Sequence, residues 1–240
     1  MEKNGIWHEE WKIPAFMIGN DQKTNLTSIC NILQNAAGLH ALHRGLGFDD
    51  MQKMGYIWLM NRLKVNMNNF PVWAESIRLQ TWVSSMRGPF SDRHFTFQND
   101  KGETIGSAST FWVAVNIKTR KPARLNSNDL PILADKLPDC GKSNKLSVIT
   151  EFDHRSVYQV QYNDLDMVGH VNNTKYAEWM VNHLVNMEAG FRPSRLEMNF
   201  LSETLFGESV VIKSKKLENG FGCMVLKENE ETVICRGRFS

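Results

Sequence analysis

The sequence is poor in cysteine, and none of its cysteines lies in a metal-binding pattern. Its 240 residues include only Cys30, Cys140, Cys223 and Cys235, with no C-x-x-C pair. Zinc and iron-sulfur sites usually need closely spaced cysteine or histidine ligands. We therefore expect reduced structural thiols, no metal and a cytoplasmic protein.

Long apolar runs are also missing. No segment approaches the roughly 20 apolar residues of a transmembrane helix, so no membrane span is expected. Residues 1–14, "MEKNGIWHEEWKIP", have neither the apolar centre of a signal peptide nor the acid-poor composition of a transit peptide. The sequence therefore predicts no leader of either kind.

Charge of one sign is not concentrated anywhere. The formal net charge is +2, and no block of five like charges or repeated basic and aromatic pattern occurs. Nucleic acid is therefore not an expected partner. The length and the 42% hydrophobic composition are enough for the core of one large or two small domains.

An internal repeat favours two similar domains. "RLKVNM" at Arg62–Met67 resembles "RLEMNF" at Arg195–Phe200, 133 residues later, and the same offset aligns Glu75 with Glu208. Two matches in one register indicate a duplication.

Each copy combines a helical pattern with strand patterns. An apolar stripe in the first copy, beginning at Ile29, follows candidate helix caps at Thr24, Asn25 and Thr27. The second stripe consists of Tyr176, Met180, Leu184 and Met187. Gly47-Phe48 and Gly190-Phe191 are expected to end the two helices.

Alternating patterns follow both helices, with a hairpin turn expected at "NDKG", residues 99–102. The chain is thus predicted to be α+β, with a helix packed on an antiparallel sheet in each half. The predicted divisions are a module at 1–120, a proline-containing connector at 121–150 and a second module at 151–240.

The most unusual polar stretch is "DLDMVGHVNNTKYAEWM", Asp164–Met180. Its acids and asparagines are typical of a helix N-cap, but capping does not require His170. In a functional site, His170 would exchange protons near neutral pH, and Asp166 would orient it or position water. Gly169 would allow close approach of a substrate. The residues alone leave both interpretations open.

The same stretch resembles the D-x-D-x-N-x-H-V-N-N-x-x-Y segment of the acyl-acyl-carrier-protein thioesterase family. Similar motifs in the first half include "WLMNRLKVNMNNFPVW" and "STFWVAVNIKTRKPARL", so the resemblance covers nearly the whole chain. It implies a tandem hot-dog fold. It also implies Asp166 and His170 as catalytic residues, together with Glu203 in "NFLSETLFGE".

Two positions depart from this family pattern. Thr204 stands where plant relatives often have cysteine, so no cysteine nucleophile is expected. Val168, which we include among the substrate-binding residues, stands where asparagine is common. The backbone amides from Gly169 through Val171 to Asn172 are expected to bind the developing oxyanion.

The resemblance implies hydrolysis of fatty acyl-acyl-carrier protein to free fatty acid and carrier thiol, without a cofactor. The expected partner is acyl carrier protein, which presents the acyl group on phosphopantetheine. Hydrolysis of acyl-coenzyme A and non-catalytic binding or sensing of an acyl thioester are the alternatives, and a homodimer is left open.

Overall fold

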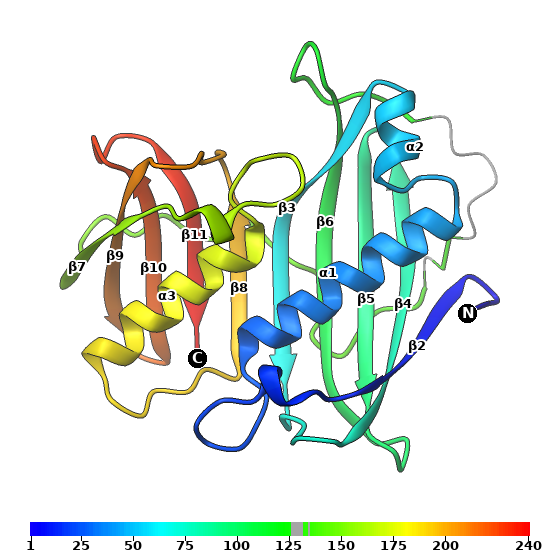
Figure 1. Cartoon of the computed structure of the whole chain (residues 1–240), viewed down its shortest axis with the longest axis horizontal. Coiled ribbons are helices and arrows are strands. Elements are labelled where there is room, and N and C mark those ends of the chain that lie inside the picture. The colour runs from blue at the N-terminus through cyan, green and yellow to red at the C-terminus, as the bar shows by residue number, and fades with distance from the viewer. Residues whose placement is uncertain (126–131, 134) are drawn as a thin grey trace. The chain divides into compact units, whose positions relative to one another are not determined.

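The computed structural model describes residues 1–125, 132–133 and 135–240, which divide into two compact units, Met1–Ser143 and Asn144–Ser240. Each unit has one long helix lying on an antiparallel sheet, as the sequence predicts (Figure 1). Such an arrangement buries the apolar stripe of the helix against the apolar face of the sheet. Residues 126–131 and 134, which belong to the predicted connector, lie outside the described residues.

In the first unit the strand order is β1-β2-β4-β5-β6-β3, with antiparallel neighbours. The "NDKG" segment forms the predicted turn between β5 and β6, where the Gly102 N–H donates to the Asn99 carbonyl at 3.0 Å. The strands of this unit are β1 (Glu2–Lys3), β2 (Ile6–Lys12), β3 (Tyr56–Met67), β4 (Ser76–Arg87), β5 (Phe90–Gln98) and β6 (Thr104–Asn116).

In the second unit the order is β8-β11-β10-β9-β7, again antiparallel. Its strands are β7 (His154–Gln159), β8 (Arg195–Phe200), β9 (Ser209–Leu217), β10 (Gly220–Lys227) and β11 (Val233–Phe239). The repeated "RLKVNM" and "RLEMNF" segments lie in β3 and β8, respectively.

Helix α1 (Leu26–His43) covers the first sheet, and α3 (Asn173–Met187) covers the second. Asn25 is the N-cap of α1, because its side chain accepts the Ser28 N–H at 2.8 Å. In α3 the fully buried Met180 lies so close to β11 that a Cβ on Gly237 would come within 2.6 Å of its sulfur. Glycine at that position therefore permits the helix to pack tightly on the sheet.

One predicted helix end is wrong. Helix α1 ends at His43, followed by Gly45 with a φ of +67°. Gly47 instead begins a second short helix, α2 (Phe48–Lys53), where Asp50 accepts the Gly47 N–H. The glycine-phenylalanine pair is ambiguous in sequence because glycine is common at both helix ends. After α3, Gly190 does adopt the left-handed conformation, with a φ of +85°.

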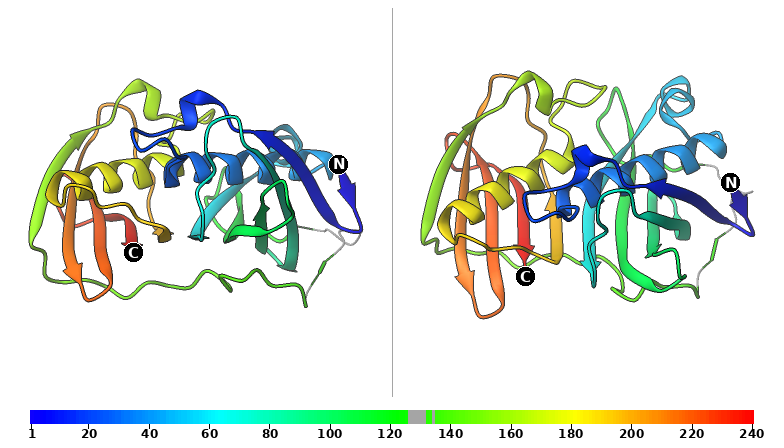
Figure 2. Two further views of the ribbon diagram at one scale, coloured as in Figure 1. Left: turned by 90° about the horizontal axis from the view of Figure 1, so that it is seen from below. Right: turned by 60° about the horizontal axis from the view of Figure 1, so that its bottom comes forward.

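The segment that joins the units packs on the sheet faces opposite the helices (Figure 2, left). In the first unit, the Trp82 indole N–H donates to the Lys136 carbonyl at 2.8 Å. In the second, Arg238 contacts Ser147, and Ile149 fills the space beside Gly222. The described parts of residues 121–150 therefore belong to the packed structure of one unit or the other.

Candidate active site

The polar stretch folds into a loop between a 3-10 turn, η2 (Tyr162–Asp164), and helix α3. Leu165 forms an antiparallel bridge with Val171, and the Asp166 N–H donates to the His170 carbonyl at 2.7 Å. Between them, Gly169 has a φ of +82°, a conformation that glycine adopts without the steric cost of a side chain. The loop is therefore a tight turn closed by backbone contacts, and His170 lies in the segment that leads back towards α3.

Asp166 stabilises this turn. Its Oδ1 accepts the backbone N–H of Val168 at 2.9 Å and that of His170 at 3.2 Å. The Oδ2 atom has no hydrogen-bond donor among the described residues, so it is available to water or a substrate. The hydrogen bonds of Asp166 thus fix the backbone of His170 rather than its imidazole.

The group beside the imidazole is Glu203. Its Oε1 lies 3.6 Å from His170 Nδ1, and both side chains are partly buried. The segment after β8 reaches the loop because the Val171 N–H donates to the Thr204 carbonyl at 2.9 Å and His170 forms a bridge with Leu205. The structure therefore brings together His170 and Glu203, which lie 33 residues apart in the sequence.

The backbone amides expected to bind an oxyanion are already engaged. The N–H groups of Gly169 and Asn172 donate to the carbonyls of Asp166 and Asp164, respectively, and the Val168, His170 and Val171 amides have the acceptors given above. That expectation is therefore wrong for this conformation, because forming the closed turn itself consumes these donors.

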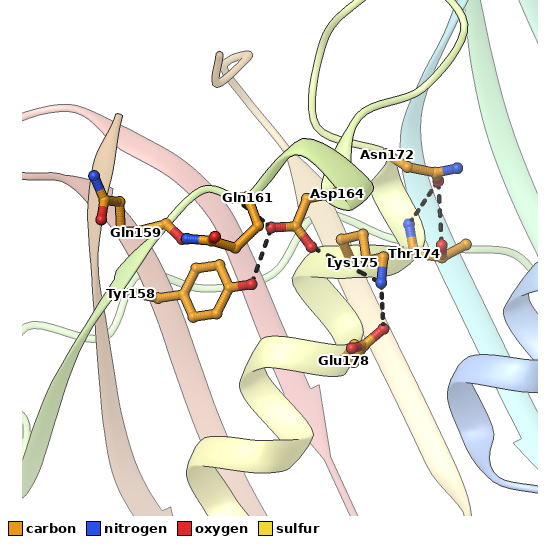
Figure 3. A network of polar contacts seen from close by, with 8 residues as sticks. All are labelled: Tyr158, Gln159, Gln161, Asp164, Asn172, Thr174, Lys175 and Glu178. Carbon is orange, nitrogen blue, oxygen red and sulfur yellow. Dashed lines mark hydrogen bonds and ion pairs between the residues drawn. The ribbon is translucent and has the colours of Figure 1, made fainter. Parts of the chain in front are cut away.

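Asn172 is the N-cap of α3. Its Oδ1 accepts the N–H of Thr174 at 3.1 Å and its hydroxyl at 3.2 Å, which leaves the side-chain NH₂ group directed away from the helix (Figure 3). The capping interpretation is thus confirmed for Asn172. Asp166, which the sequence also offers as a cap, accepts N–H groups of the loop instead, and the Asp164 carboxylate contacts Tyr158, Gln161 and Lys175.

No thiol is positioned for nucleophilic attack among the described residues around His170. Thr204 is fully buried beside Glu203. In the neighbouring sheet, burial raises the pKa values of the Cys223 and Cys235 thiols, which keeps both protonated and unreactive. The candidate chemistry is therefore acid-base chemistry of histidine and carboxylate groups.

The first unit contains a second copy of the loop. Ile18 forms a bridge with Thr24, the Gly19 N–H donates to the Lys23 carbonyl at 2.8 Å, and Gln22 has a φ of +65°. Lys23 forms a bridge with Val72, as His170 does with Leu205. This copy has the backbone of the second loop without its histidine.

The side chains at the positions of the candidate catalytic residues differ between the two copies. Gly19 and Lys23 stand at the positions of Asp166 and His170, and Phe70 is the counterpart of Glu203 at the 133-residue offset. Only the second unit therefore carries the candidate catalytic groups.

The Glu75 and Glu208 match also has a structural explanation. Glu75 Oε2 accepts the Val72 N–H at 2.9 Å, and Glu208 Oε2 accepts the Leu205 N–H at the same distance. Each carboxylate thus closes the turn that follows β3 or β8. The repeated acid supports the fold, and in the second unit it holds the segment that carries Glu203.

In the described part of the chain, no cluster of three or more histidine, cysteine, aspartate or glutamate side chains could hold a metal ion. The described helices include none that is both long enough and apolar enough to cross a membrane.

Fold and loop together define a tandem helix-on-sheet protein with a candidate acid-base site in its second unit. The acyl-ACP thioesterase N-terminal domain family matches residues 4–131, and the acyl-ACP thioesterase C-terminal domain family matches residues 148–239. The chain belongs to the acyl-ACP thioesterase family.

Curated relatives agree with this assignment. The chain is 29% identical over 189 residues to an acyl-[acyl-carrier-protein] hydrolase, FATB3, of Cuphea viscosissima, an alignment covering 73% of this chain and 46% of that protein. A palmitoyl-acyl carrier protein thioesterase of Arabidopsis thaliana is 29% identical over 194 residues, with the same coverage. The chain thus spans about half the length of the curated relatives it matches.

Solved structures match over nearly the whole chain. An acyl-ACP thioesterase from Bacteroides thetaiotaomicron superimposes with a TM-score of 0.89 at 27% identity, covering 98% of this chain and 97% of the other. The 12:0-ACP thioesterase from Umbellularia californica has the same fold, with a TM-score of 0.83 at 18% identity and coverage of 100% and 98%. The predicted tandem hot-dog fold is confirmed.

Proposed function

We propose that this chain hydrolyses a fatty acyl thioester carried on acyl carrier protein, releasing a free fatty acid and the carrier thiol. Membership of the acyl-ACP thioesterase family supports the substrate class. The observation that carries the chemistry is the pairing of His170 Nδ1 with Glu203 Oε1 at 3.6 Å in a loop fixed by Asp166.

In the proposed reaction, His170 removes a proton from a water molecule that attacks the thioester carbonyl. Glu203 faces the imidazole and stabilises the imidazolium that forms. The 3.6 Å separation exceeds a direct hydrogen bond and shortens when substrate is bound, as catalytic contacts often do. Asp166 Oδ2 holds the water. The tetrahedral intermediate then breaks its carbon-sulfur bond, and His170 returns the proton to the leaving thiolate.

The developing oxyanion needs a donor other than the engaged loop amides. Asn172 has an extended backbone, and its side-chain NH₂ group points away from the capped helix end (Figure 3). Residues two apart in extended backbone project to the same side, so this group belongs to the side of the loop that carries His170. We propose that the Asn172 amide donates to the oxyanion, and that the Val168 side chain lies beside the attacking water.

Turnover with the purified chain tests the proposal. Acyl carrier protein charged with fatty acids of several chain lengths is mixed with the protein, and free thiol and free fatty acid are measured together. We expect many turnovers per protein molecule. Product that stops at one equivalent, or binding without product, would indicate the acyl-thioester-binding alternative.

The same chain lengths on coenzyme A distinguish the two enzyme activities. Because both substrates contain the same reacting carbonyl, the comparison isolates recognition of the carrier. A higher kcat/KM for the acyl-carrier substrates is expected, and the reverse order would assign the activity to acyl-coenzyme A.

The cellular location and the oligomeric state of the protein remain predictions. The cysteine content predicts a cytoplasmic protein, whereas the curated relatives are named as chloroplastic. Fractionation of source cells checks the location. A homodimer is likewise untested, and sedimentation of the purified chain measures its oligomeric state.

A further inference from the structure

Asp164 is a buried acidic residue at the start of the candidate catalytic loop, and the end of the loop is hydrogen-bonded to it. Asp164 is only 4% exposed. Its carbonyl accepts the Asn172 N–H at 2.8 Å, so the backbone of the loop closes on Asp164. His170 lies inside the segment that this contact closes.

The side chain of Asp164 is held from several directions (Figure 3). Its Oδ2 accepts the Tyr158 hydroxyl at 2.9 Å and the Gln161 N–H at 2.8 Å, and Lys175 Nζ lies 3.8 Å from Oδ1. These partners come from β7, the start of η2 and the first turn of α3. The carboxylate thus joins three elements around the loop.

The Tyr158 hydroxyl keeps the proton that it donates to Asp164. Burial, together with its hydrogen bond to Asp164, raises the pKa of Tyr158 to about 12, so the hydroxyl stays protonated over the pH range of any ordinary assay. Its ring also packs on Trp179 of α3, with the ring centroids 4.5 Å apart. The tyrosine therefore connects the edge strand to the helix through both ring packing and Asp164.

The first unit shows that the fold does not require this carboxylate. Met17 occupies the equivalent position, at the end of the corresponding 3-10 turn, η1 (Ala15–Met17), and is also buried. Its N–H donates to the Pro14 carbonyl at 3.1 Å, as the Asp164 N–H donates to the Gln161 carbonyl at 3.1 Å. The same turn is thus built with an apolar residue.

Stability alone does not explain the difference between the two units. Removing a carboxylate from water is costly, and replacing a buried ion pair by apolar residues is often neutral or stabilising. The carboxylate occurs in the copy of the loop that also carries His170 and Glu203.

We propose that Asp164 is a positioning residue that sets the placement of His170 relative to Glu203, with Tyr158 as its main partner. This inference rests on the proposed function. The contacts of the Asp164 carboxylate given above are with Tyr158, Gln161 and Lys175, so it acts by fixing both ends of the loop. With methionine in its place, the loop would close through its backbone alone, as the loop of the first unit does.

The test compares Asp164→Asn and Tyr158→Phe with a matched control, Ser156→Ala. Ser156 is also on β7 and bonds to α3, through His183 Nδ1 at 2.7 Å. We expect Asp164→Asn and Tyr158→Phe to lower kcat by about 10-fold or more with KM within about twofold, and the control to leave both unchanged. Circular dichroism and the thermal midpoint establish that each variant is folded.

A double-mutant cycle separates positioning from general damage. Because Asp164 acts through His170, Asp164→Asn should cost less than about twofold in a His170→Ala background, measured in single turnovers. An equal loss in both backgrounds would overturn the proposal, as would unchanged kcat in folded Asp164→Asn and Tyr158→Phe.

A second readout does not depend on turnover. The NMR chemical shifts of the His170 imidazole should change in Tyr158→Phe and remain unchanged in Ser156→Ala. If the wild-type chain hydrolyses no thioester, the proposed function fails while this shift still tests the placement of His170. Unchanged His170 chemical shifts in folded Tyr158→Phe and Asp164→Asn would overturn the positioning role.

Discussion

His170 and Lys23 occupy the same position in two copies of one loop. Each forms an antiparallel bridge to the turn that follows the strand with the repeated motif: His170 bridges to Leu205 after β8, and Lys23 bridges to Val72 after β3. The backbone was thus kept in both halves while the side chain changed. This pair supplies a matched control for the site, because Lys23→Ala alters the same loop position in the unit without the candidate catalytic groups.

The first prediction concerns the site residues. His170→Ala, Glu203→Gln and Asp166→Asn should each reduce turnover by roughly 100-fold or more, because they remove proton-transfer or positioning groups. Lys23→Ala should keep turnover within about twofold. Hydrolysis of an acyl-carrier substrate by folded variants provides the measurement, and near-wild-type rates in all three site variants would reject the assignment.

The second prediction concerns Val168, which is 38% exposed. Only its backbone N–H contributes to the turn, by donating to Asp166, so the side chain is free to change. Val168→Asn adds an amide beside the proposed water site and should preserve or raise turnover. A large loss in a folded variant would show instead that the pocket requires an apolar group here.

The third prediction concerns the basic segment "KTRKPAR", residues 118–124. It forms an exposed turn at the end of β6, closed by the Asn116 N–H donating to the Lys121 carbonyl at 2.9 Å. If this turn steers an acidic carrier, converting Arg120 and Lys121 to Glu should raise KM for acyl-carrier substrate, most strongly at low salt.

Hydrolysis of a small acyl thioester is the control for the basic turn. It should change little, since such a substrate does not reach a docking surface. Equal effects on both substrates would indicate damage to the fold or the site. No effect on either would show that the turn is an ordinary solvated segment.

The fourth prediction concerns Ala74, an exposed residue with a φ of +62°. Its counterpart in the second unit is Gly207, with a φ of +78°. Left-handed backbone costs a residue with a Cβ about 1–2 kcal/mol, partly offset by the greater chain entropy of unfolded glycine. Ala74→Gly should therefore stabilise the chain by about 0.5–1 kcal/mol in urea unfolding; destabilisation would contradict the strain argument.

The fifth prediction concerns His94, a fully buried residue on β5 whose Nε2 lies 2.6 Å from the Ser84 hydroxyl. Burial, with a smaller contribution from Lys142, lowers the pKa of His94 to about 4. Below about pH 6.5 the unfolded chain binds a proton that the folded chain excludes, so stability falls as the pH decreases towards about 4. This residue should contribute a loss of about 2 kcal/mol between about pH 6.5 and 5.

Unfolding of the His94→Gln variant checks that contribution. The variant removes the titrating group, so its stability should depend less on pH over this interval than that of the wild type. Identical pH dependence in the two proteins would place the acid sensitivity elsewhere.

The sequence by itself determined the duplicated helix-and-strand pattern and the hairpin turn at residues 99–102, and it gave Asn25 as one of three candidate N-caps. These features depend on local periodicity, on turn chemistry or on capping, and a short stretch of sequence contains all the residues that decide them. It did not predict β1, β2, β7 or α2. Strand β1 and helix α2 are short, and β2 and the edge strand β7 are only partly buried, so their apolar patterns are weak.

The motif also identified His170, Asp166 and Glu203 as candidates, but only the tertiary structure decided their contacts. The imidazole faces Glu203 from the segment after β8, whereas Asp166 is used by the backbone of its own turn. The sequence suggested that the loop amides bind an oxyanion. It does not show that these N–H groups already donate hydrogen bonds within the closed turn. The buried environment of Asp164 was likewise decided by packing, since Tyr158 and Lys175 reach its carboxylate only after strand and helix have come together.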